Sequence, residues 1–273
     1  WKNHPAFFNT EGTIPFDLFA AAFYLITRYE EWLPHQTDEY GRYRPEQSLA
    51  YQNDFVQFPL VNYWVVQLAK ELNFEITHHY TFKPSYDIDI AYSYLHHNSI
   101  RNSLSYFKLL VNLKFNQLVE QLQVLAGAQK DHYDVYDWLH LLHESLQLKP
   151  LYFFLVASKR DSLHKNISPQ SAAMQALIIS HAKKYSVGIH PSVVQKNSIP
   201  IKGTREQVLG KEIKLLAEII QQPVKHSRQH YIHINFPETY ETFLHKGIEA
   251  DYSMGYPQIT GFRASYTKPF TWF

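Results

Sequence analysis

The feature that most constrains the fold is an alternation, beginning near residue 76, between short apolar runs and longer amphipathic stretches. The short runs, rich in β-branched and aromatic residues, predict strands over 76–86, 151–156, 186–190, 230–236 and 248–253. The amphipathic stretches predict helices over 99–126, 134–148, 168–184, 204–222 and 238–246. Because parallel strands need a crossover connection, usually a helix, this order predicts an α/β fold with a parallel sheet or barrel.

The first 75 residues lack this alternation. They contain one predicted helix over 16–33, which Pro34 ends, and another over 60–72. We therefore expect a mostly helical N-terminal extension over residues 1–75, part of a larger domain, followed by the α/β region over residues 76–273.

Composition excludes several classes of protein. With 26 basic and 25 acidic residues, the net charge of +1 provides no field to hold a nucleic acid. The absence of cysteine excludes disulfides, thiolate metal sites and cysteine nucleophiles. No run approaches the roughly 18 apolar residues that indicate a transmembrane helix. The chain begins at Trp1 without a signal peptide and ends on an apolar stretch, so we expect a cytoplasmic location and cut ends, with the α/β region truncated at its C-terminus.

Chemically capable residues lie at the ends of the predicted strands, where α/β proteins place their active sites. They are Asp87, Asp89, His190, Asp251 and Ser253, with Arg228 just ahead of its predicted strand. Asp87 and Asp89 are two residues apart, so an extended backbone points both to one face, one as a metal ligand and one as a general base. His190 offers the imidazole common at zinc sites. The alternatives are aspartates that cap local amides and an arginine in an ordinary surface ion pair.

Three segments carry patterns that resemble the motifs of a known family. They are 85–89 (S-Y-D-I-D), 228–231 (R-Q-H-Y) and 251–253 (D-Y-S). They are similar to the T-F-D-D-G, R-x-P-Y and D-x-S motifs of the polysaccharide deacetylase family, metal-dependent hydrolases that remove N- or O-acetyl groups from sugars. The resemblance implies a distorted (β/α) barrel over residues 76–273. It also implies that Asp87 is the catalytic base, that Asp89 is a metal ligand and that Arg228 orients the base.

Further segments are similar to a divergent subgroup of this family that has a helical N-terminal extension. They are 16–20, 28–31, 152–155, 188–192 and 261–264. This resemblance extends over nearly the whole chain. The D-x-S motif implies that Asp251 and Ser253 wall the substrate groove. We also expect Tyr231 to bind substrate, and Arg263 to be a partner either for a carboxylate or for substrate.

One family motif is incomplete in this chain. The family places two metal-binding histidines four residues apart, whereas His190 is followed at that distance by Val194. Catalytic zinc sites use three protein ligands, and the third is left open among Ser192, His164 and His230. The family's last motif, which supplies a histidine as general acid, has no clear counterpart before residue 273.

The sequence therefore predicts a metal-dependent hydrolase with a divalent metal, which we expect to be zinc. Its expected substrate is an acetylated oligo- or polysaccharide or a sugar-containing precursor, and Asp87 would take a proton from metal-activated water. Two alternatives stay open. One is a catalytically impaired glycan-binding or assembly protein on the same fold, favoured by the missing second histidine. The other is a barrel metallohydrolase that acts on other amides or on phosphoesters.

Overall fold

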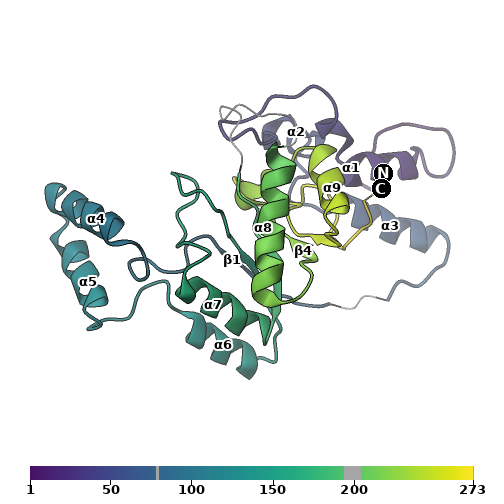
Figure 1. Ribbon diagram of the computed structural model, residues 1–273. Helices are drawn as coiled ribbons and strands as arrows, with labels where there is room; N and C mark the ends of the chain where they lie inside the picture. The colour runs from purple at the N-terminus through teal and green to yellow at the C-terminus, as the bar shows by residue number, and fades with distance from the viewer. Residues whose placement is uncertain (78–79, 194–203, 273) are drawn as a thin grey trace. The chain divides into compact units, whose positions relative to one another are not determined.

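A computed structural model describes residues 1–77, 80–193 and 204–272 (Figure 1). The described residues form two compact units. One contains the chain up to Thr81 and again from Tyr231 onward, and the other runs from Phe82 to His230. This division differs from the predicted boundary at residue 75, because the last forty or so residues pack with the N-terminal ones. None of the helices in the described part of the chain has the length and hydropathy needed to cross a membrane.

The second unit is built on parallel strands. They are β1 (Ser85–Ile88), β2 (Leu151–Phe154), β3 (Ser186–Ile189) and β4 (His226–Ser227), and they lie side by side in that order. All four residues of β2 are buried, as expected of a strand inside a parallel sheet. The connections contain α6 (Tyr136–Ser145), α7 (Ala172–Ala182) and α8 (Thr204–Ile220) (Figure 1). The predicted α/β class with a parallel sheet is confirmed.

Some predicted elements differ in detail from the structure. In the described residues, the strand predicted over 76–86 forms only as β1, Ser85–Ile88. The strand predicted over 230–236 does not form. The chain pairs earlier, at β4, and then enters a 3₁₀ turn, η3 (His230–Ile232), in which Tyr231 has a left-handed φ of 58°. Arg228 therefore follows its strand instead of preceding it.

The helix predicted over 99–126 is divided into α4 (Ser99–Val111) and α5 (Phe115–Leu125). The division falls at Leu113, whose φ of 54° ends the first helix. The two helices lie side by side as a hairpin in Figure 1, and Gln121 of α5 donates to the Asn102 carbonyl oxygen of α4.

The first unit is mostly helical. It contains α1 (Leu18–Ile26), η1 (Tyr29–Glu31), η2 (Pro45–Gln47), α2 (Leu49–Gln52), α3 (Leu60–Glu71), α9 (Glu238–His245) and the two-residue strand β5 (Ala250–Asp251). Its core includes Phe16, Leu25, Leu60 and the fully buried Trp64. The helix predicted over 16–33 ends early because Arg28 adopts a left-handed φ of 57°.

Gly188 in the middle of β3 sets the spacing of the sheet. A Cβ atom at this position would lie 2.7 Å from the carbonyl oxygen of His226 and 2.8 Å from the ring of Phe153. Both distances are shorter than van der Waals contact, and the carbonyl belongs to the backbone of the neighbouring strand. Only glycine therefore allows β3 to approach β2 and β4 this closely.

We expect Gly188→Ala to lower the free energy of unfolding by about 1–3 kcal/mol, because the added methyl group must push apart neighbouring strands. Urea denaturation followed by circular dichroism measures the change. Gly255→Ala is the matched control, since its Cβ would meet no atom within 4 Å. An equal loss of stability in both variants would show that the close approach at Gly188 is not what makes glycine necessary.

Candidate metal centre

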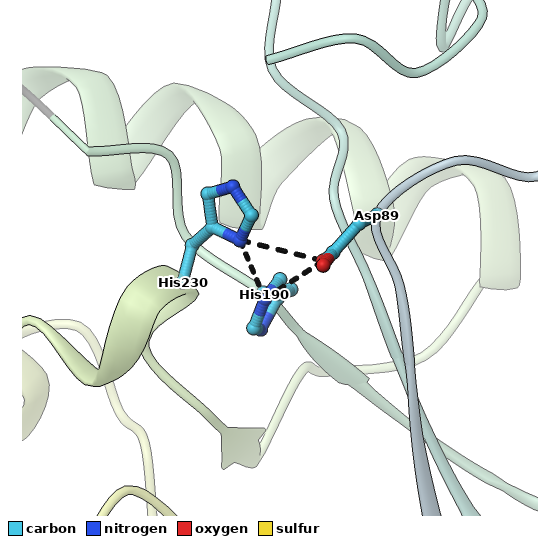
Figure 2. Close-up of side chains that lie close together, drawn as sticks. All are labelled: Asp89, His190 and His230. Carbon is cyan, nitrogen blue, oxygen red and sulfur yellow. Dashed lines mark hydrogen bonds and ion pairs between the residues drawn. The ribbon is translucent and has the colours of Figure 1, made fainter. Parts of the chain in front are cut away.

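Three side chains from the ends of parallel strands converge on one point. Asp89 follows β1, His190 follows β3, and His230 lies in η3 after β4 (Figure 2). Oδ1 of Asp89 lies 3.0 Å from Nε2 of His190 and 3.3 Å from Nδ1 of His230. The two ring nitrogens are 2.9 Å apart. Parallel strands end at one edge of the sheet, which is why residues so far apart in sequence meet here.

The backbone fixes which ring nitrogens carry protons. Nδ1 of His190 lies 2.6 Å from the carbonyl oxygen of Arg228, and Nε2 of His230 lies 3.1 Å from that of Leu163. A carbonyl oxygen only accepts, so these nitrogens donate. In the neutral rings the other nitrogens then point lone pairs at each other and at Asp89. Such an arrangement needs a cation between its members, either a metal ion or a proton on one ring.

The geometry fits a metal ion. With both rings neutral, the buried Oδ1 of Asp89 is an acceptor without a hydrogen-bond donor. Two ligands that each lie about 2.0–2.1 Å from a tetrahedral zinc are about 3.3 Å apart, close to the spacings of these three atoms. His190 and His230 are buried, so the site is shielded from water on the imidazole side. An Asp/His/His group of this kind can hold a divalent metal.

The charge of Asp89 is set by its neighbours. Burial alone would raise the pKa of this carboxyl, but hydrogen bonds and charge from the neighbouring His190 and His230 outweigh burial and hold the pKa well below its usual range. Asp89 therefore stays ionised, as a metal ligand must.

Asp87 lies beside this group and forms an ion pair with Arg228. Nη1 of Arg228 is 3.2 Å from Oδ1 of Asp87, and Nη2 donates to Oγ of Ser85 at 2.6 Å. The guanidinium carbon lies 4.7 Å from the centre of the buried Phe153 ring. Oδ1 of Asp87 is 4.0 Å from Nδ1 of His190. The predicted base and the residue predicted to orient it are thus in contact at the edge of the metal centre.

The sequence left three candidates for the third ligand, and the structure places one of them at the metal centre. His230 joins Asp89 and His190. In His164, Nδ1 lies 2.9 Å from Asp161 and Nε2 accepts from the backbone N–H of Val193. Ser192 donates to Glu212 at 2.5 Å. Val194, where the family has its second histidine, lies outside the described residues.

The residues predicted to bind substrate lie in the first unit, each with local partners. Asp251 accepts from the N–H and the hydroxyl of Ser253 at 2.9 and 2.7 Å. The ring of Tyr231 stacks on that of Tyr40 with 5.3 Å between centres. Substrate binding by Tyr231, Asp251 and Ser253 stays a prediction.

Arg263, also predicted to bind substrate, lies in the interior of the first unit. Its Nε and Nη2 donate to the two carboxylate oxygens of Glu31 at 2.8 and 2.5 Å. Arg28 donates to the same carboxylate at 2.7 Å. Burial favours the neutral acid, but the two arginines outweigh it and lower the pKa of Glu31. The structure thus places Arg263 in a buried ion-pair cluster.

The comparisons with known proteins are limited. Residues 1–77 match the model of a family of unknown function (DUF7033). No curated protein matches the chain at a significant level. A solved structure, that of IcaB from Ammonifex degensii, is similar with a TM-score of 0.31 and 15% sequence identity, over 42% of this chain and 52% of that one. The chain thus matches about half the length of that protein. Similarity at this level carries no inference about the metal centre.

We expect the purified chain to bind one zinc ion and His230→Ala to weaken binding by at least about a hundredfold, because it removes one of three ligands. Isothermal titration calorimetry measures the affinity. His164→Gln is the control, since this histidine competed with His230 as third ligand and its two ring nitrogens have other partners. Weaker binding in His164→Gln and unchanged binding in His230→Ala would reverse the assignment.

Proposed function

We propose that the chain is a metal-dependent hydrolase that removes acetyl groups from a carbohydrate. The observation that carries the proposal is the convergence of Asp89, His190 and His230 on one point, with a carboxylate, Asp87, held beside them. A three-ligand site with a neighbouring carboxylate is the arrangement that hydrolytic metal enzymes use. The resemblance of segments 85–89 and 228–231 to polysaccharide deacetylase motifs supports the acetyl group as the target.

The chemistry divides between the metal and Asp87. A divalent metal, which we propose is zinc, would polarise the acetyl carbonyl and lower the pKa of a water that it binds. Asp87 accepts the proton that this water loses when it attacks the carbonyl carbon. The bond from that carbon to the sugar nitrogen or oxygen would then break, and a proton would return to that atom, so that acetate and a free amine or hydroxyl are released.

Arg228 acts as a positioning residue for this step. Its contacts with Ser85 and Asp87 hold the carboxylate in one orientation beside the metal centre.

The proposal also covers the fold, the substrate and the location of the protein. The parallel sheet would be part of a distorted (β/α) barrel, and the substrate would be an acetylated oligo- or polysaccharide or a sugar-containing precursor. Tyr231, Asp251 and Ser253 would contribute to its binding, and the protein would act in the cytoplasm. A non-catalytic glycan-binding protein was favoured by the missing second histidine. His230 supplies an imidazole from a different strand end, which favours the hydrolase instead.

Acetate release from acetylated chito- and xylo-oligosaccharides tests the proposal. We expect turnover that requires zinc and stops with a chelator. Asp87→Asn should lower kcat by about 10²–10⁴-fold, because an amide cannot take the proton. Asp137→Asn, on an exposed carboxyl of α6, is the matched control. Release of acetate by Asp87→Asn at the wild-type rate would contradict the assigned base.

Arg228→Lys separates orientation from charge. Lysine keeps the positive charge but cannot reach Ser85 and Asp87 together through a planar fork. We expect kcat to fall about 10- to 100-fold, as misplacement of a catalytic group does, while zinc affinity stays unchanged. Steady-state kinetics with a parallel zinc titration measures both. A fall in zinc affinity of the same size would assign Arg228 to the metal site as a whole.

A further inference from the structure

A pocket of the second unit, apart from the metal centre, is lined by basic side chains. It is open to solvent and has a volume of about 310 Å³. Its lining residues are Asn98, Arg101, Arg160, Asp161, His164 and Lys165. Three of these six carry a positive charge and one carries a negative charge. None of the six belongs to the metal centre.

Within the described part of the chain, the cations of this pocket have no carboxylate partner. Arg101 donates to a ring nitrogen of His97 and, at 3.0 Å, to the carbonyl oxygen of Lys165. Arg160 lies 3.4 Å from Nδ1 of His97. Among the ion pairs of the described residues, none includes Arg101, Arg160 or Lys165. Burial and the charge of Arg160 lower the pKa of Arg101, as expected when like charges face one another without a counterion.

His97 is the neutral residue that brings the two arginines together. Burial lowers its pKa to about 4, so it carries no charge near neutral pH. Its Nε2 lies 2.8 Å from the carbonyl oxygen of Tyr92, which leaves Nδ1 to accept from the guanidinium groups. The fold therefore holds two arginines over one uncharged acceptor. An ion pair that would satisfy them within the chain is missing from the described residues.

The charge balance of the pocket indicates the ligand. Arg101, Arg160 and Lys165 together carry +3, and Asp161 carries −1, which leaves +2. Asp161 is itself engaged by the backbone N–H groups of Leu163 and His164, at 2.9 and 3.0 Å. A phosphate monoester carries about −1.5 to −2 at pH 7, whereas a carboxylate carries only −1. The first turn of α4, which begins beside Asn98, adds the positive end of a helix dipole.

We propose that Arg101, Arg160 and Lys165 form a binding site for the phosphoryl group of a ligand. Two guanidinium groups and an ammonium group match the several acceptor oxygens of such a group. His164 lines this pocket, and its ring lies 5.9 Å from that of His230 in the metal centre. We therefore expect the phosphoryl group to belong to the sugar substrate; this part of the inference rests on the proposed function.

Titration of the metal-free protein tests the pocket apart from the metal centre. The probes are glucose 1-phosphate, inorganic phosphate, glucuronate and glucose, added at low salt and followed by calorimetry after the chelator has been removed. We expect glucose 1-phosphate to bind one-to-one and glucose not to bind. Arg160→Gln and Lys165→Gln should each weaken binding about tenfold or more, because each removes a charged donor.

Lys108→Gln, on an exposed lysine of α4, is the control and should leave the affinity unchanged. Arg160 and Lys165 are exposed, so their variants should fold, and circular dichroism checks this. Three results would overturn the phosphoryl site. They are no binding of either glucose 1-phosphate or inorganic phosphate, wild-type affinity for glucose 1-phosphate in both Arg160→Gln and Lys165→Gln, and glucuronate binding as tight as that of glucose 1-phosphate. Inorganic phosphate binding as tightly as glucose 1-phosphate would keep the site and overturn its assignment to a sugar-borne group. Acetate release stays a separate measurement, so either proposal can fail alone.

Discussion

The backbone and side chain of Arg228 connect the sheet to both parts of the candidate site. Its N–H donates to the carbonyl oxygen of Ile189, which ties the end of β4 to β3. Its own carbonyl oxygen accepts from Nδ1 of His190 and so directs Nε2 toward Asp89. Its guanidinium holds Asp87. Because one residue sets the pairing of two strands, the tautomer of a ligand and the orientation of the base, the position of β4 controls the geometry of the whole centre.

Buried or crowded arginines in this protein fall into two kinds, and their partners distinguish them. Arg28 and Arg263 both pair with the buried Glu31, and Arg28 also pairs with Glu30 at 2.7 Å. Two carboxylates therefore balance two cations, and the first unit contains a cluster that is satisfied without a ligand. Arg101 and Arg160 instead meet at a neutral histidine and face an open pocket. An unbalanced cation pair costs free energy in the free protein unless an anion offsets it. The contrast is the physical reason to assign a structural role to the first pair and a binding role to the second.

The sequence could predict the parts of the site that depend on local pattern. Asp87 lies in β1, Asp89 follows β1 and His190 follows β3, and the parallel order of those strands brings the three to one edge. His230 could not be chosen in the same way. The alternation of apolar and polar residues over 230–236 is typical of a strand. In the structure, however, Tyr231 and Ile232 both have left-handed φ angles, and tyrosine and isoleucine give no sequence signal for such angles. The return of the chain after residue 230 to the N-terminal unit also depends on long-range packing that has no local signal.

The position of His230 changes what the missing histidine motif means. Where two histidines four residues apart supply the ligands, one segment sets most of the metal geometry. Here the three candidate ligands come from three different strand ends, so their spacing depends on the distances between β1, β3 and β4. At Gly188, β3 lies so close to β4 that an added Cβ atom would be only 2.7 Å from the carbonyl oxygen of His226. The close packing of the strands then sets the positions of the ligands, as two histidines four residues apart would do within one segment. A metal site can therefore persist in a chain whose sequence lacks that histidine motif.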